Sequence, residues 1–281
     1  MDATLNRPLS VVGFDSAWTD KPNAPGAICV IRSDRNGRVT FLEPQLASFA
    51  QAIAVVEEER SQSPLCLVAI DQPTIVPNKN SCRPVERVAG SLISWIGGGV
   101  QPSNRSRKGM FDDGAPIWAF KERLNAAEDP EQARAANSGL FIMEVFPALA
   151  LAGINNAYCV RHGAPRYNPA RRKTFQVSHW TGVVNLVAEF GKRLALSELE
   201  NWRFDLLALE RPRKADQDKL DAVICALIGL HWMAASRDHS VMIGDLSSGY
   251  MVAPSLHGIH ERLTNKAGAT GVPIDGVVPF T

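Results

Sequence analysis

Four carboxylates stand in positions where they could share one metal ion. The apolar runs VVGFDSAW, LCLVAID and GLFIMEVFP each carry one acidic residue at or near the end, namely Asp15, Asp71 and Glu144. A fourth, Asp221, stands near the start of the apolar segment 216–236. Carboxylates brought together away from bulk water repel one another unless they share a cation or one is protonated. Such oxygen ligands suit Mg²⁺ or Mn²⁺.

Any one of these aspartates has a simpler explanation as a turn or helix-cap residue. Glu144 is harder to explain in that way, because two further apolar residues follow it before Pro147. If the three runs are neighbouring parallel strands, their C-terminal ends open on the sheet edge where α/β proteins bind ligands. The joint pattern, rather than any single residue, therefore predicts a site.

The elements that would position these residues predict an α/β fold. Strands are expected over 11–18, 26–33 and 39–43, with the hairpin signal Asn36-Gly37 before the third. Helical spacing follows over 46–60 and a buried strand over 65–71. This order predicts an antiparallel meander, then a right-handed crossover to a strand parallel to an earlier one. We expect a mixed five-stranded sheet flanked by helices.

The rest of the chain is expected to complete one domain over 1–281. Residues 139–151 read as a strand ending at Pro147, 181–208 as a long helical region, 216–236 as a buried helix and 248–255 as a short edge segment. Between them, 74–138 is rich in proline and glycine and has weak periodicity. We expect a loop-rich insertion or cap there.

Composition favours a protein of the cytoplasm without a global attraction for polyanions. The formal net charge is +1, so any nucleic-acid surface must be local. The five cysteines are scattered without a C-x-x-C pair, which is typical of reduced thiols. The first ten residues lack an apolar signal core, and no stretch approaches the roughly 20 apolar residues of a membrane span. Oligomeric state is left open.

Several segments together resemble a known family. GFDSAW, VAIDQPTIVP with the downstream CRPVER, EVFPALAL, KLDAVICALIGL and SGYMVAPS are similar to motifs of bacterial predicted nucleases catalogued as domain of unknown function 429. The resemblance extends over about residues 11 to 255 and implies a ribonuclease H-like fold. It also implies metal ligation by Asp15, Asp71 and Asp221, with Glu144 near the same site.

The activity implied is hydrolysis of phosphodiester bonds with two Mg²⁺ or Mn²⁺ ions about 3.5–4 Å apart. All four carboxylates are expected to be catalytic, with Asp15 or Asp71 bridging the ions. A nucleic-acid partner (RNA, DNA or a hybrid) needs cations beyond the metals, and we expect these from Arg83, Arg87 and Lys173. Arg83 follows Asp71 within the resemblance and is expected to face the site.

Two other functions remain open at this stage. A nucleotide-dependent phosphotransferase of the actin and sugar-kinase type shares the strand and helix plan, but the first strand continues as DSAWT rather than as a glycine-rich phosphate turn. A binding module that has lost its metal is the other. The sequence shows no G-x-S-x-G elbow and no metal-finger spacing, and Gly97-Gly98-Gly99 lacks the Lys-Ser/Thr of a phosphate loop.

Overall fold

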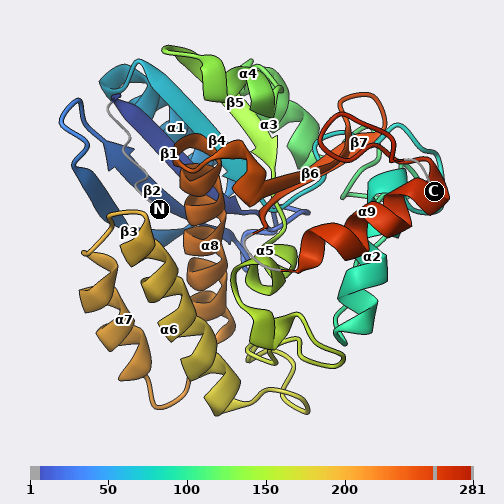
Figure 1. Cartoon of the computed structure of the whole chain (residues 1–281). Coiled ribbons are helices and arrows are strands. Elements are labelled where there is room, and N and C mark those ends of the chain that lie inside the picture. The colour runs from blue at the N-terminus through green and yellow to red at the C-terminus, as the bar shows by residue number, and fades with distance from the viewer. Residues whose placement is uncertain (1–6, 256–257, 280–281) are drawn as a thin grey trace.

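A five-stranded mixed sheet forms the centre of the molecule in the computed structural model, which describes residues 7–255 and 258–279 (Figure 1). The strand order is β3-β2-β1-β4-β5. The strands span Leu9–Asp15 (β1), Gly26–Ser33 (β2), Val39–Ala47 (β3), Leu65–Ile70 (β4) and Gly139–Glu144 (β5). The expected α/β class and mixed five-stranded sheet are confirmed.

Local sequence signals account for the first half of the sheet. β1, β2 and β3 form the antiparallel meander, and the turn before β3 places Gly37 at a φ of +76°. Helix α1 spans Phe49–Gln62 rather than starting at 46, because Leu46 belongs to β3 and Ser48 caps the helix together with Gln51. The crossover through α1 then returns β4 parallel to β1, as expected.

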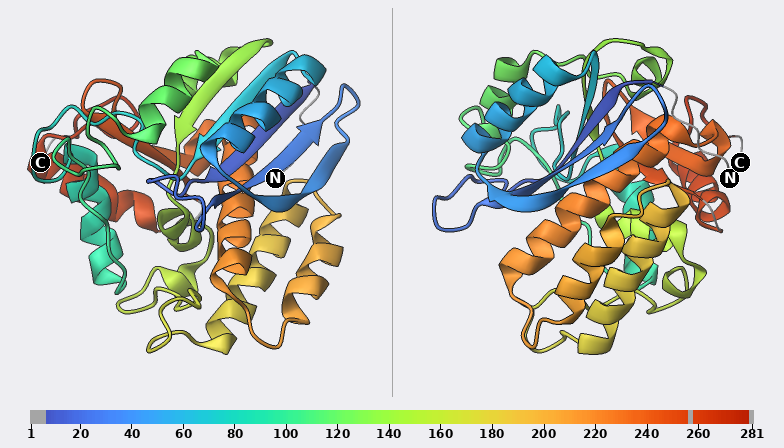
Figure 2. Two further views of the ribbon diagram at one scale, coloured as in Figure 1. Left: turned by 180° about the vertical axis from the view of Figure 1, so that it is seen from behind. Right: turned by 90° about the vertical axis from the view of Figure 1, so that its left-hand side faces the viewer.

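Side-chain alternation along the central strands builds a core on each face of the sheet. Val11 of β1 and Leu67 of β4 pack with α6 (Val177–Arg193), α7 (Leu199–Leu207) and α8 (Lys214–Ala234). Val12 and Val68 point the other way, toward α1 and α3 (Pro116–Leu124). In the right view of Figure 2, α1 lies on one side of the twisted sheet and α6 to α8 on the other. The expected helix over 181–208 is thus two helices.

A third core lies beside β5, around a two-stranded hairpin. The hairpin strands are β6 (Ser240–Asp245) and β7 (Gly249–Pro254), packed with α2 (Pro84–Trp95), α5 (Pro147–Ile154) and α9 (Ile259–Thr270). The segment expected at 248–255 is therefore part of this hairpin, which meets the main sheet at the bridge between Val145 and Val252. The strand expected over 139–151 ends at Glu144, because Pro147 starts α5.

The segment 74–138 is more helical than its composition indicates. It holds α2, α3 and α4 (Pro130–Ala135). Helix α2 packs in the third core, α3 packs beside α1 against the sheet, and α4 packs through Ala133 in the core that contains α8. Two short 3₁₀ helices, Asn156–Tyr158 (η1) and Arg237–His239 (η2), complete the elements. Within the described residues, no helix combines the length and apolar character needed to cross a bilayer.

Candidate functional site

Asp15 and Asp71 lie side by side at the C-terminal edge of the sheet. β1 and β4 are parallel neighbours in register, with Phe14 opposite Ile70. The Asp71 N–H donates a 2.9 Å hydrogen bond to the Phe14 carbonyl, which fixes the two aspartates on adjacent strands. Both side chains are partly exposed. The buried apolar strands that precede them thus deliver two carboxylates to one open edge.

Asp221 joins this edge because α8 packs unusually close to β1. A Cβ on Gly13 would lie 2.2 Å from the Ala226 nitrogen and 2.3 Å from the Ala222 oxygen. Only glycine permits this approach of helix backbone to strand. Asp221 immediately precedes Ala222 and is 7% exposed. The third carboxylate is therefore placed over the end of β1.

Neighbouring carboxylates affect the pKa values of Asp15 and Asp71. Burial raises the pKa of Asp15 well above its usual range, with further contributions from the charges of Asp221 and Asp71. Burial also raises the pKa of Asp71, and Asp221 adds to it. Lys214 opposes both shifts. The buried Cys225 thiol has a raised pKa from burial and then from all three carboxylates. The three negative charges thus converge on a small region.

Asp221 has two hydrogen-bond donors that the sequence reasoning did not identify. Tyr167 donates from its hydroxyl to Oδ1 at 2.7 Å, and Gln217 donates from its amide to Oδ2. Burial raises the pKa of Asp221 to about 6, and these donors together with Lys214 hold it lower than burial alone would. Gln217 stands one helical turn before Asp221, so its spacing was a usable signal. Tyr167 is 54 residues from Asp221, and the sequence holds no signal of their pairing.

Glu144 lies beside Asp71 but is engaged elsewhere. It ends β5 opposite Ile70, and its charge is one of the causes that raise the pKa of Asp71. Both its oxygens pair with Arg83, at 2.8 and 2.6 Å, and the Thr74 N–H also donates to it. Burial raises the pKa of Glu144 to about 7, against the lowering effect of Arg83.

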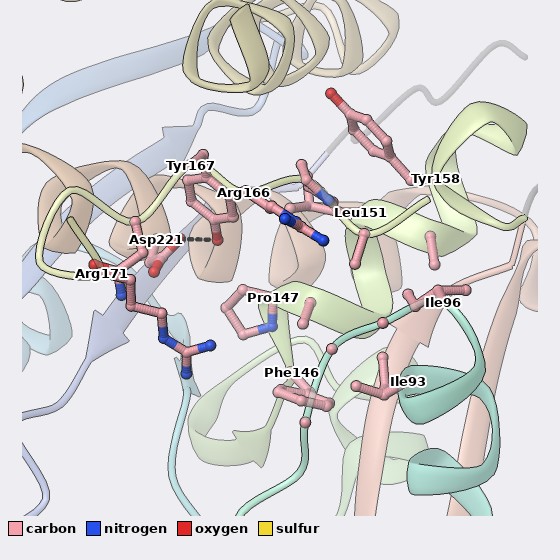
Figure 3. Close-up of a pocket in the computed structure, with 18 of the residues that line it drawn as sticks. Ile93, Ile96, Phe146, Pro147, Leu151, Tyr158, Arg166, Tyr167, Arg171 and Asp221 are labelled. Carbon is pink, nitrogen blue, oxygen red and sulfur yellow. Dashed lines mark hydrogen bonds between the residues drawn. The ribbon is translucent and has the colours of Figure 1, made fainter. Parts of the chain in front are cut away.

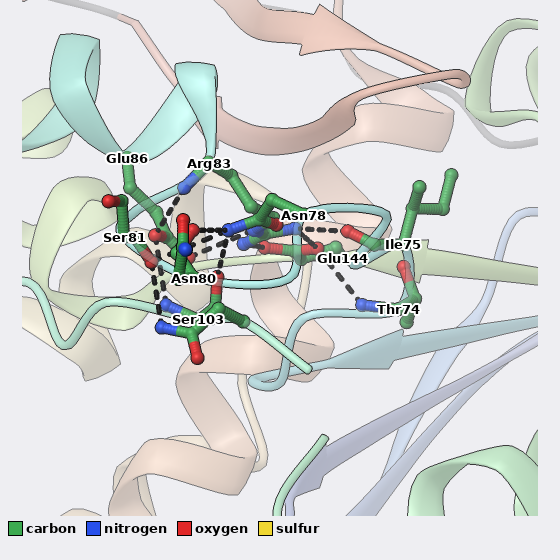
Figure 4. A network of polar contacts seen from close by, with 10 residues as sticks. Thr74, Ile75, Asn78, Asn80, Ser81, Arg83, Glu86, Ser103 and Glu144 are labelled. Carbon is green, nitrogen blue, oxygen red and sulfur yellow. Dashed lines mark hydrogen bonds and ion pairs between the residues drawn. The ribbon is translucent and has the colours of Figure 1, made fainter. Parts of the chain in front are cut away.

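Arg83, expected to bind substrate, is instead fully buried within this network. Its remaining donors go to Glu86 at 2.9 Å and to the Ile75 carbonyl at 3.0 Å (Figure 4). A guanidinium with two buried carboxylate partners cannot reach a ligand without breaking those pairs. The structure therefore gives Arg83 a structural role, which its position after Asp71 did not reveal.

A pocket of about 380 Å³ opens beside Asp71 and Asp221. Its walls come from the end of α2, the first turns of α5 and α8, and the segment 158–174 (Figure 3). Two exposed arginines of that segment, Arg166 and Arg171, line it, whereas the expected substrate-binding residues Arg87 and Lys173, which are also exposed, lie outside its walls. The arginines that line the pocket are therefore not among the three residues expected from the sequence to bind substrate.

The donor chemistry of Asp15, Asp71 and Asp221 fits a divalent cation. Each pKa is raised, and for Asp15 and Asp71 neighbouring negative charge contributes, so a shared cation would relieve a repulsion that the fold maintains. Across 7–255 and 258–279, no three His, Cys, Asp or Glu side chains stand in the arrangement of a finished metal centre. A cation bound here would therefore have to draw the carboxylates closer together.

Comparison with known proteins gives a family and no activity. The model of the family described as "Protein of unknown function (DUF429)" matches residues 13–245, so the chain belongs to that family. The match includes all four carboxylates. No curated protein and no solved structure matches the chain.

Proposed function

We propose that this family member is a divalent-metal-dependent phosphoesterase that hydrolyses phosphodiester bonds of nucleic acid. The observation that carries the proposal is the convergence of Asp15, Asp71 and Asp221 at one sheet edge with raised pKa values. These residues would hold Mg²⁺ or Mn²⁺. Such ions lower the pKa of an attacking water and stabilise charge on the leaving oxygen. Hydrolysis adds the hydroxyl of water to phosphorus and its proton to the departing oxygen.

Assignment to the ribonuclease H-like superfamily is part of the same proposal. It is supported by the strand order, the antiparallel meander followed by two parallel strands, and the aspartates on β1, after β4 and on the late helix α8. We also place the protein in the cytoplasm. All five cysteines are free thiols, which is the usual state in that compartment.

The surrounding residues would prepare the carboxylates for this role. Tyr167 and Gln217 orient Asp221 and favour its ionised form, because both donate to its oxygens. Lys214 favours the ionised forms of all three aspartates. Glu144, expected among the catalytic carboxylates, acts in our proposal as a carboxyl group held beside Asp71 without binding the metal, since Arg83 occupies both of its oxygens.

The residues at the C-terminal edge of the sheet favour hydrolysis over nucleotide-dependent phosphotransfer. A kinase of the actin type needs an open glycine-rich turn after the first strand to hold phosphate. Here Trp18 follows β1, and its indole N–H donates a 3.0 Å hydrogen bond to the Asp71 carbonyl. The ring also packs edge-on against Phe111. A bulky side chain therefore crosses the position where such a turn would hold phosphate.

Mn²⁺ titration of the wild type, Asp71→Asn and Asp205→Asn tests the proposal by calorimetry. Asp205 is an exposed aspartate of α7 and serves as the matched control. We expect the wild type and the control to bind Mn²⁺ and Asp71→Asn to bind at least about tenfold more weakly. The wild type and Asp205→Asn should cleave a mixed pool of RNA and DNA when Mn²⁺ is present, and Asp71→Asn should cleave it much more slowly. Equal Mn²⁺ affinity in all three proteins would refute the metal site.

A further inference from the structure

The pocket beside Asp71 and Asp221 has two chemically different ends. One end is apolar and is formed by residues from α2, α5 and η1, namely Ile93, Ile96, Leu151 and Tyr158. The other end holds Asp221, its neighbour Asp71 and Arg171, and Arg166 lies between the two ends (Figure 3). Ligand pockets commonly combine an apolar wall with a few converging polar groups that fix orientation. This pocket is therefore built for a ligand with an apolar body and a charged group.

The charged group is identified by three features that attract an anion. The guanidinium groups of Arg166 and Arg171 have no hydrogen-bond or ion-pair partner among the described residues. Figure 3 shows Arg171 extending from the loop toward the wall at Pro147 and Phe146, while the side chain of Arg166 ends beside Leu151. That wall is the N-terminal end of α5, where Pro147 is the first helical residue. A helix N-terminus carries partial positive charge. Pro147 has no N–H, and the Leu149 and Ala150 N–H groups donate to the Phe146 carbonyl at 3.0 Å, so α5 contributes this partial charge rather than a row of free donors.

The loop that carries the arginines is fixed to the end of α2. The His162 N–H donates to the Trp95 carbonyl at 3.2 Å, and the Ala164 N–H donates to the Ile96 carbonyl at 2.8 Å. Gly97 follows with a φ of +90°, a backbone conformation that side-chain-bearing residues rarely adopt. The loop thus forms a fixed side of the pocket, whose volume of about 380 Å³ lies near the lower end of the roughly 300–1,000 Å³ range for small-ligand sites.

We propose that this pocket binds one nucleotide-sized phosphoester, with the phosphate at Arg166, Arg171 and the start of α5 and the base against Ile93, Ile96 and Leu151. The inference rests on the proposed function and narrows its substrate to a free nucleotide phosphoester or the terminal nucleotide of a single strand. A pocket of about 380 Å³ is of a size for one nucleotide rather than for a stretch of duplex. Asp71 and Asp221 then lie at the phosphate end.

Equilibrium dialysis with adenosine 5′-monophosphate tests the pocket directly, with and without Mn²⁺. Arg166→Ala and Arg171→Ala should each weaken binding about tenfold or more, since each removes a charge-assisted contact to phosphate. Arg161→Ala and Arg172→Ala remove exposed arginines that lie outside the pocket walls, and their affinity should stay within about twofold of the wild type. Equal losses in all four variants would overturn the pocket and leave only general charge attraction.

Competition by oligonucleotides separates the two sources of the phosphoester. A linear single strand that displaces the mononucleotide, while a closed circle of the same sequence does not, assigns the pocket to strand ends. Displacement by neither assigns it to free nucleotides. Equal displacement by the linear strand and the circle would overturn the proposal, because a pocket that binds a free or terminal nucleotide requires a strand end, which the circle lacks.

The outcomes also distinguish this inference from the proposed function. Mn²⁺ binding that depends on Asp71, combined with absence of mononucleotide binding, would refute the pocket and keep the metal site. Mononucleotide binding that depends on Arg171 in a protein that binds no Mn²⁺ would refute the phosphoesterase and keep the pocket as a nucleotide-binding site.

Discussion

The hydroxyl of Tyr167 and the carboxylate of Asp221 are joined by a 2.7 Å hydrogen bond between two parts of the chain 54 residues apart. Tyr167 belongs to the loop that lines the pocket, and Asp221 belongs to the helix behind the sheet. The bond favours the ionised form of Asp221, whereas burial favours the neutral form. Burial has the larger effect, and the pKa of Asp221 is about 6. The pocket wall and the carboxylate edge are therefore physically connected.

Replacement of Tyr167 by phenylalanine is expected to weaken metal binding in a pH-dependent way. Loss of the hydrogen bond raises the pKa of Asp221, so a smaller fraction is ionised near pH 6.5. Mn²⁺ affinity of Tyr167→Phe should therefore be clearly below that of the wild type at pH 6.5 and should approach it at pH 8. Calorimetric titration at both values checks this. An equal deficit at both pH values would contradict the ionisation argument.

The metal-free protein is expected to lose stability as pH rises from about 4 to 7. Asp221 has a folded pKa of about 6 against the usual 3.8, and Glu144 about 7 against 4.5. A group whose pKa is raised by folding stabilises the fold fully below its unfolded pKa and loses that contribution as pH rises through the folded value. For Asp221 the loss is up to about 3 kcal/mol.

Urea unfolding of the wild type and Asp221→Asn, with chelator present, measures this contribution. The variant should be the more stable of the two at pH 8, and the difference should shrink as the pH falls through 6 and disappear only below about pH 4. At pH 8, Mn²⁺ should raise the stability of the wild type but not that of Asp221→Asn, because the cation binds the ionised carboxylates. A difference that does not vary with pH would contradict the expected ionisation of Asp221.

Arg83→Met is expected to be strongly destabilising. The change leaves Glu86 and Glu144 buried without their shared partner, and loss of one member of a buried ionic network costs about 3–5 kcal/mol. Arg87→Met, at an exposed position in the first turn of α2, should change the free energy of unfolding by about 0.5 kcal/mol or less. Urea denaturation compares them. A stable Arg83→Met protein that fails only in substrate binding would instead assign Arg83 to the substrate.

The sheet could be predicted because its signals are local. Strand runs, the Asn36-Gly37 turn and the helix between parallel strands each act over a few residues, and they place Asp15 and Asp71 at one edge. Local signals also misled at particular points. The apolar run after Glu144 continues a strand pattern, but Pro147 starts a helix there. The proline-rich segment 74–138 concealed three helices, each with a proline at its start.

The pocket could not be predicted because contacts between distant segments create it. Arg83 and Arg166 are equally basic in the sequence, yet one is neutralised inside the fold and the other is free at a cavity. Only the buried partners Glu86 and Glu144 distinguish them. Tyr167 likewise becomes a partner of Asp221 only when its loop is attached to α2 and α8 is in place. Residue type and position in sequence carry no record of such pairings.

Gly13→Ala tests whether close packing of α8 on β1 is what places Asp221. A methyl group there would overlap the backbone at Ala222 and Ala226, which flexible side chains cannot relieve. We expect a loss of about 3 kcal/mol or more in the free energy of unfolding, at the upper end for overpacking, and weaker Mn²⁺ binding in whatever protein remains folded. Gly114→Ala is the matched control, because a Cβ at this exposed turn meets nothing within 4 Å. If Gly13→Ala keeps the stability and the Mn²⁺ affinity of the wild type, the prediction is wrong. The positions of the three aspartates would then not require close contact between α8 and β1.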